Sequence, residues 1–282
     1  MLAAPITPVA YSLAAVVAWG TSDFFGGIGA RRTNAFVFTT LLSLGGMAFM
    51  AVLAGVSRAP VPSLHSTAWA LAGGASGGAC LALFYRALSA GSMGLAAPVA
   101  AVIAAGIPAL VGMVTEGLPG RIELAGFVVA GIGLWLVAFS PGSPGSGPSN
   151  VPLAALAGVG FAGFYLCIRQ AGSASPIWLA LFTRAGGLFS TGVVVLAQRR
   201  ASELFAGRAL WASLVGALDS SGTMLFILAS QTGRLDEAVV LCSLYPAVTV
   251  ILARIFLKEH FSIWKLAGLL AILASVPMIA AG

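Results

Sequence analysis

The stretch PGSPGSGPSN, residues 141–150, divides the sequence into two halves of similar length. It consists of proline, glycine, serine and one asparagine and carries no charge, which is the composition of a flexible linker. The sequence on both sides is strongly apolar: 59% of the 282 residues are hydrophobic and only 8% are charged. A soluble domain carries about a quarter charged residues, so we predict an integral membrane protein without a separate soluble domain.

Apolar segments separated by short polar breaks recur along the whole chain. A helix needs about 20 residues to cross about 30 Å of hydrocarbon. The expected helices cover residues 8–29, 36–56, 67–89, 94–115, 122–140, 151–170, 176–197, 208–230, 235–257 and 262–281. The sequence therefore predicts an all-α integral membrane fold with ten transmembrane helices.

Short motifs recur at a fixed distance in the two halves. ALSAG at residues 87–91 corresponds to ASQTG at 229–233, and LAG at 124–126 corresponds to LAG at 266–268, in both cases 142 residues later. A spacing close to half the chain length, kept over several helices, indicates an internal repeat.

Each half holds five of the expected helices. Because five is an odd number, the second half enters the membrane from the opposite face, which gives an inverted-topology repeat. We therefore expect a first five-helix repeat at residues 1–140, a flexible linker at 141–150 and a second five-helix repeat at 151–282. Since such a chain contains a complete pathway, we expect it to work as a monomer.

Several motifs give the chain a resemblance to a known family. Trp19 and Gly20 form a WG pair in the first expected helix, and a glutamate ends the fourth helix of each half (Glu116 in TEG, Glu259 in KEH). With these features the sequence resembles the EamA family of the drug/metabolite transporter superfamily, and within it the YddG-type exporters. The resemblance implies a secondary transporter that exports small neutral or aromatic amino acids across the bacterial inner membrane by alternating access. The alternative is the same fold exporting another metabolite, a drug-like cation or a nucleobase.

The resemblance also implies that both termini lie in the cytoplasm, but the charges oppose this orientation. It would place four arginines on the cytoplasmic side and seven arginines and lysines outside. The positive-inside rule expects the reverse.

Two aspartates stand inside expected helices, where an ionisable side chain costs at least about 2.5 kcal/mol and needs a reason. Asp219 lies at the centre of the eighth helix, and Asp23 shares a face of the first helix with Trp19, four residues earlier. Either acid could bind a substrate ammonium or carry a coupling proton, and the indole of Trp19 offers cation–π attraction. The alternatives are that Asp219 is a structural acid paired with an arginine, and that Asp23 meets headgroups or pairs with Arg31 or Arg32.

Arg184 lies well inside the seventh expected helix. We expect its side chain to snorkel or to cap backbone carbonyls in a peripheral helix. The alternative is that it pairs with Asp219 or Asp23, or binds a substrate carboxylate through two hydrogen bonds.

Further candidates for substrate binding are three tyrosines and a serine. Tyr85 and Tyr165 end apolar stretches, where the alternative role is anchoring at the membrane interface. Tyr245 and Ser243 lie deeper, next to Pro246. A proline frees backbone carbonyls, and such groups often line a cavity.

Two prolines and two glutamates are candidates for a helix break or a gate. Pro108 in the fourth helix and Pro246 in the ninth predict that both of these equivalent helices are interrupted. Glu116 and Glu259 end the same helices, where the helix dipole disfavours an anion. We expect these glutamates to latch a gate.

The glycines of GGASGGAC, residues 73–80, are spaced four residues apart in two series. This spacing is typical of close contact between membrane helices, so we expect packing rather than phosphate binding.

No motif indicates catalysis, a metal or a cofactor. HExxH is absent, and His65 and His260 lie at loop positions. Basic residues stand mostly at the ends of apolar runs, where they reach headgroups rather than form a nucleic-acid site. We therefore expect a non-enzymatic protein whose partners are a small-molecule substrate and membrane lipid. A non-transporting structural or sensory membrane protein is the alternative from another class.

Overall fold

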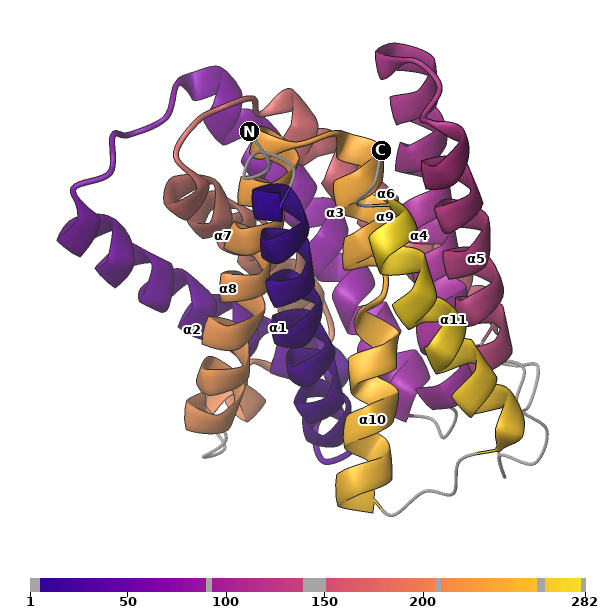
Figure 1. Cartoon of the computed structure of the whole chain (residues 1–282). Coiled ribbons are helices and arrows are strands. Elements are labelled where there is room, and N and C mark those ends of the chain that lie inside the picture. The colour runs from indigo at the N-terminus through magenta and orange to yellow at the C-terminus, as the bar shows by residue number, and fades with distance from the viewer. Residues whose placement is uncertain (1–5, 90–92, 139–150, 206–208, 258–261, 280–282) are drawn as a thin grey trace.

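The structure is a computed structural model of the whole chain, and it describes residues 6–89, 93–138, 151–205, 209–257 and 262–279. Within these ranges the fold is all-helical (Figure 1). The helices are α1 (Ile6–Ala30), α2 (Ala35–Ser57), α3 (Leu64–Ser89), α4 (Met93–Glu116), α5 (Arg121–Ala138), α6 (Val151–Gln170), α7 (Pro176–Ala197), the 3₁₀ helix η2 (Ala201–Phe205), α8 (Ala209–Thr232), α9 (Leu235–Cys242), α10 (Tyr245–Leu257) and α11 (Ile263–Ile279). A helix lies over each expected range, and the ninth range holds two, α9 and α10.

Seven helical segments of the described residues are long and apolar enough to cross a membrane. They are Thr7–Ala30, Ala35–Ser57, Leu64–Ser89, Pro152–Gln170, Pro176–Ala197, Ala209–Thr232 and Leu235–Leu257, the last of which combines α9 and α10. Two shorter apolar segments are Val99–Thr115 in α4 and Ile263–Ile279 in α11. By length and composition the chain is therefore a multi-pass membrane protein.

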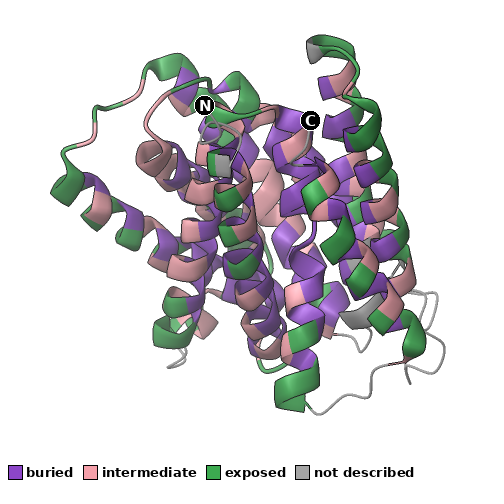
Figure 2. Cartoon of the chain, in the orientation of Figure 1, coloured by how far each residue is buried: buried purple, intermediate pink, exposed green. Residues whose placement is uncertain are grey.

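The outer faces of the helices are apolar as well. Figure 2 shows exposed residues along the outside of the bundle and buried residues between the helices. Val114, Phe189 and Leu273 are largely exposed although all three are hydrophobic. Such side chains are costly to expose to water, whereas lipid tails accept them.

The bundle has two ends. Helix α1 begins and α11 ends at the same end, which we call the terminal end, and the opposite one is the far end (Figure 1). The connections between α2 and α3, between α4 and α5, and between α8 and α9 lie at the terminal end.

Contacts between the two halves of the chain form the centre of the bundle. Helix α3 packs against α6 and α7, while α8 packs against α1 and α2. Helix α2 also contacts α7, and α5 lies along α11. The interior is therefore built from pairs of helices that come from opposite halves.

Glycines in α3 allow its close approach to α7. A Cβ on Gly74 would collide with the backbone of Thr183, and one on Gly78 would collide with the backbone of Gly187. The prediction that GGASGGAC serves helix packing is confirmed at these two positions. The same segment fits the GxSxG pattern of hydrolases, with Ser76 in the nucleophile position, but Ser76 lies in mid-helix and donates a hydrogen bond to the carbonyl of Gly160 at 3.0 Å.

Candidate functional site

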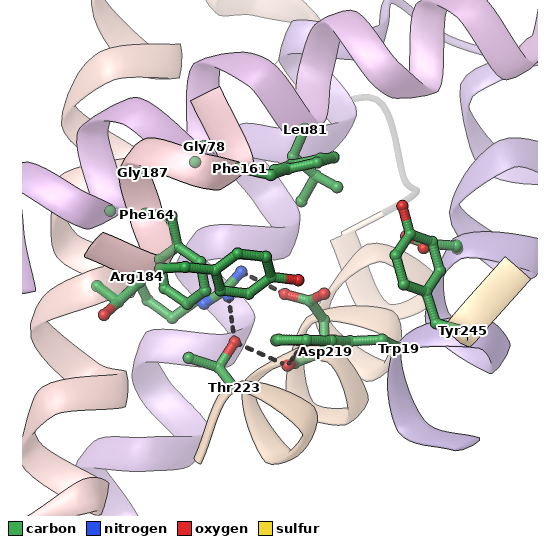
Figure 3. A pocket seen from close by; sticks show the side chains of 15 residues that line it. Trp19, Gly78, Leu81, Phe161, Phe164, Arg184, Gly187, Asp219, Thr223 and Tyr245 are labelled. Carbon is green, nitrogen blue, oxygen red and sulfur yellow. Dashed lines mark hydrogen bonds and ion pairs between the residues drawn. The ribbon is translucent and has the colours of Figure 1, made fainter. Parts of the chain in front are cut away.

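A cavity lies in the middle of the bundle between the two halves of the chain. Side chains from α1, α3, α6, α7 and α8 and from the first residue of α10 line it (Figure 3). The empty space amounts to about 580 Å³, including the opening.

An ion pair between Arg184 of α7 and Asp219 of α8 lies on the cavity wall (Figure 3). Arg184 is only 8% exposed and Asp219 only 4%. The guanidinium also donates from Nη2 to Thr223 Oγ1 at 2.8 Å. The expectation that Arg184 snorkels in a peripheral helix is wrong, because a buried carboxylate one helix away holds its charge inside the bundle.

Asp219 also accepts hydrogen bonds from two residues of α1. Ser22 Oγ donates to Asp219 Oδ1 at 3.3 Å, and the indole nitrogen of Trp19 donates to the backbone carbonyl of Asp219 at 3.2 Å. Asp219 thus combines the two roles considered from the sequence, since it is paired with an arginine and also borders the cavity.

Asp23 lines the same cavity and is 5% exposed. The structure buries it inside the bundle, and among the described residues no ion pair joins it to Arg31 or Arg32. Its neighbours are the hydroxyl of Tyr85 and the carboxylate of Asp219. Two carboxyl groups and one guanidinium therefore face the cavity, so one of the acids has no matching cation there.

Aromatic rings form the remainder of the wall. Ring centroids lie 6.2 Å apart for Trp19 and Tyr165, 5.7 Å apart for Trp19 and Phe226, and 4.8 Å apart for Tyr165 and Phe226. Phe161 and Phe164 of α6 extend this cluster along the cavity. Such rings present flat apolar faces to a ligand and attract cations through their π-systems.

The three candidate tyrosines are buried and do not anchor the chain at an interface. Tyr165 and Tyr245 line the cavity, while Tyr85 is completely buried beside Asp23. The hydroxyls of Tyr85 and Tyr245 lack a hydrogen-bond partner of ordinary geometry. The alternative role of Tyr85 and Tyr165 as interfacial anchors is therefore wrong.

The helix break expected in the ninth range is present, whereas the one expected in the fourth is not. Helix α9 ends at Cys242 and α10 begins at Tyr245, with Pro246 in its first turn, where a proline needs no backbone donor. Ser243 is buried at the break, and its hydroxyl donates to the Val239 carbonyl at 2.7 Å. Helix α4 continues without a break through Pro108, so the interruption predicted there is wrong.

The structure does not describe the side chains of the two glutamates, Glu116 and Glu259, that were expected to latch a gate. Glu116 ends α4, but its side chain lies outside the described residues, and so does the whole of Glu259.

A different charged cluster lies at the terminal end. Arg234, which precedes α9, donates to both carboxylate oxygens of Asp236, at 3.0 and 2.7 Å, and to the carbonyl of Gly117 at 2.9 Å.

This Arg234 cluster links the connection between α8 and α9 to that between α4 and α5. Glu123 at the start of α5 lies 3.8 Å from Arg234, and Asp236 is completely buried. The arginine therefore joins the two halves of the chain at the terminal end, above the break that separates α9 from α10.

We predict that Arg234→Gln weakens this link between the two halves of the chain and lowers the stability of the folded protein. The variant leaves the buried carboxylate of Asp236 without its cation, so we expect the folded state to lose about 2 kcal/mol, the scale of a hydrogen bond to a charged group. Thermal unfolding in detergent measures this loss. Arg200→Gln is the matched control, because Arg200 pairs with Glu203 on an exposed surface at the far end, where such pairs contribute little. Equal effects of both substitutions would contradict the special role of Arg234.

Helical spacing from the predicted residues would have found several lining residues that the sequence analysis missed. Thr223 lies one turn after Asp219, Phe161 one turn before Tyr165, and Leu81 one turn before Tyr85. Thr183 carried no such signal, because its helix reaches the site only through packing. No group of three or more potential metal ligands occurs within the described residues.

Comparison with known proteins agrees with this geometry. Residues 149–281, which contain α6 to α11, match the EamA-like transporter family. The second half of the chain is therefore similar to an EamA-like transporter domain, and this similarity supports a membrane transporter of the drug/metabolite type.

The fold of the whole chain also has a counterpart among solved structures. A crystal structure of a protein superposes with a TM-score of 0.73 over 96% of this chain and 95% of the other, at 16% sequence identity. Similarity at this identity shows the fold alone, but it extends over both halves. No curated protein sequence matches the chain significantly.

Proposed function

We propose that the protein is a secondary transporter that exports small neutral or aromatic amino acids by alternating access around the central cavity. The observation that carries this proposal is the combination of charged groups and rings in one enclosed space. Arg184 can receive a carboxylate, Asp23 and Asp219 can receive an ammonium, and Trp19 and Phe161 offer flat apolar surfaces. A zwitterion with an apolar side chain complements all three features.

Binding of such a ligand would open the Arg184–Asp219 pair. The substrate carboxylate replaces Asp219 as the partner of Arg184, and the substrate ammonium compensates the released carboxylate. Each buried charge then keeps a partner, so little is lost in the exchange, whereas a free buried charge would cost several kcal/mol.

The proposed mechanism assigns the two halves as inverted five-helix repeats, 1–140 and 151–282, joined by the linker at 141–150. Positions 142 residues apart support this assignment, because several such pairs line the cavity from opposite halves. These pairs are Trp19 with Phe161, Asp23 with Tyr165, Gly77 with Asp219, and Leu81 with Thr223.

Helix contacts support the same assignment. A Cβ on Gly74 would strike the backbone of Thr183, and a Cβ on Gly216, 142 residues later, would strike the backbone of Leu42. The contact of α3 with α7 is thus repeated in the contact of α8 with α2. Related pairs of helices can exchange conformations, which is the basis of alternating access in repeat transporters.

A counterflow assay tests the proposal. The purified protein is reconstituted in liposomes loaded with unlabelled amino acid, and uptake of labelled phenylalanine, alanine and arginine is compared. We expect uptake of phenylalanine and alanine but not of arginine. No uptake of any amino acid by folded and inserted protein would refute the proposed substrate class.

The second acid of the cavity, which has no matching cation, favours a second candidate substrate, a monovalent organic cation. Phenethylamine has the ring and ammonium of phenylalanine but lacks its carboxylate. If phenethylamine is transported and phenylalanine is not, the substrate is a cation and Arg184 serves only to compensate Asp219.

We predict that Phe161→Ala lowers the preference for aromatic substrates. The variant removes one ring surface, and a loss of about 1.4 kcal/mol in ring contacts corresponds to about tenfold in affinity. Counterflow of phenylalanine relative to alanine should fall by about that factor. Phe189→Ala is the control, because Phe189 is exposed on the outer face of α7. An unchanged ratio for Phe161→Ala would exclude a ring contact at this wall.

The orientation of the protein in the membrane is predicted differently by the family resemblance and by the positions of the arginines. The resemblance implies cytoplasmic termini, whereas Arg31, Arg32 and Arg199 at the far end predict that this end is cytoplasmic. In a cysteine-free background, labelling of Ser57→Cys at the terminal end and Ser202→Cys at the far end by an impermeant reagent on whole cells distinguishes the two orientations. Both serines are exposed.

A further inference from the structure

The two aspartates of the cavity differ in how their charge is compensated. Asp219 pairs with Arg184 and accepts a hydrogen bond from Ser22. Asp23 has no ion-pair partner among the described residues, although it is as deeply buried as Asp219. An ionised carboxylate without a partner is expensive in such surroundings and takes up a proton instead.

The groups that face Asp23 from neighbouring helices offer no positive charge to compensate an ionised carboxylate. Tyr85 of α3, Tyr165 of α6 and Tyr245 of α10 are neutral phenols, and Asp219 of α8 is itself negative. Among the described residues that line the cavity, the one cation is Arg184 of α7, and it is engaged by Asp219. The described surroundings of Asp23 therefore supply hydroxyls and a second carboxylate but no cation.

We infer that Asp23 is an exchangeable proton site. In the substrate-free state its carboxyl group carries a proton. When a ligand of net charge +1 binds, the carboxyl O–H bond breaks, the proton passes to the water on the open side of the cavity, and the ligand ammonium takes its place beside the carboxylate. The cavity thus holds one compensating positive charge at any time, either the proton or the cation.

A zwitterionic ligand has a different effect. Its carboxylate and ammonium compensate each other, so the charge balance of the cavity does not change and Asp23 keeps its proton. Amines are therefore exchanged for a proton, whereas neutral amino acids are not. The exchange with a ligand rests on the proposed function, while the proton on Asp23 does not.

Infrared spectroscopy of the purified protein tests the proton site without any ligand. A protonated carboxylic acid has a carbonyl stretch that is separate from the bands of amides and carboxylates. We expect this band in the wild type and in Glu203→Gln, which alters a partly exposed acid of η2, and we expect its loss in Asp23→Asn. Asp23→Glu should retain a shifted band, so that a folding defect of the asparagine variant cannot imitate the result. A band that survives in Asp23→Asn, or is absent from the wild type, overturns the inference.

Ligand titration in weakly buffered solution with a pH indicator tests the exchange. We expect the wild type to release about one proton per bound phenethylamine and none per bound phenylalanine, and Asp23→Asn to release none with either. Binding of phenethylamine without proton release overturns the exchange. If neither ligand binds but the infrared band of Asp23 is present, the proposed function fails and the proton site stands.

Discussion

Arg184→Gln is expected to destabilise the folded protein by about 3–5 kcal/mol and to abolish transport. The substitution leaves Asp219 buried without its cation, and removal of one partner from a buried pair has costs of this size. The loss in transport follows separately, because the cavity then has no group that can receive a carboxylate. Thermal unfolding in detergent and counterflow in liposomes measure the two effects.

The double variant Arg184→Gln/Asp219→Asn separates stability from transport. Both charges are removed together, so we expect most of the lost stability to return while transport stays absent. The size of the recovery gives the coupling between the two side chains. A double variant as unstable as the single one would mean that Arg184 contributes through packing rather than through its charge.

Gly74→Val is expected to prevent the close packing of α3 on α7 and to lower stability by at least about 3 kcal/mol. A Cβ at this position would meet the backbone of Thr183, which cannot rotate away as a side chain would. The fraction of monodisperse protein in size-exclusion chromatography, together with the unfolding temperature, measures the loss.

Gly192→Val is the matched control for this prediction. Gly192 lies on α7, the helix that Gly74 of α3 contacts, but no atom comes within 4 Å of a Cβ built there. The control variant should behave like the wild type. Comparable losses in both variants would show that the valine side chain itself, rather than the contact of α3 with α7, is responsible.

The sequence predicted the helices well because lipid imposes a simple rule on composition. Each membrane-crossing helix must be long and apolar, and every expected range proved to be helical within the described residues. The failure at Pro108 has a physical reason. A proline removes one backbone donor but can remain in a membrane helix when its neighbours accept the altered geometry, and α4 does so.

The site was predictable where a residue violated the apolar rule. Asp23 and Asp219 stood out as acids in apolar helices, Trp19 followed from helical spacing, and Tyr245 followed from its depth in the helix. Arg184 was noticed but misjudged, because an arginine can snorkel and only the packing of α7 against α8 shows that it does not. Glycines of α3 border the cavity through the close contact of two helices, which sequence alone does not specify.

The paired cavity positions have a consequence for the thermodynamics of the transport cycle. On the proposed repeat, the same residues surround the ligand in both end states, but the members of each pair differ: Asp23 is matched by Tyr165, and Gly77 by Asp219. Exchange of the two conformations therefore does not reproduce the same chemical environment around the ligand. A single substrate should have unequal dissociation constants on the two faces of the membrane, and the cavity can fill at a low concentration on one face and empty against a higher concentration on the other when a gradient drives the cycle.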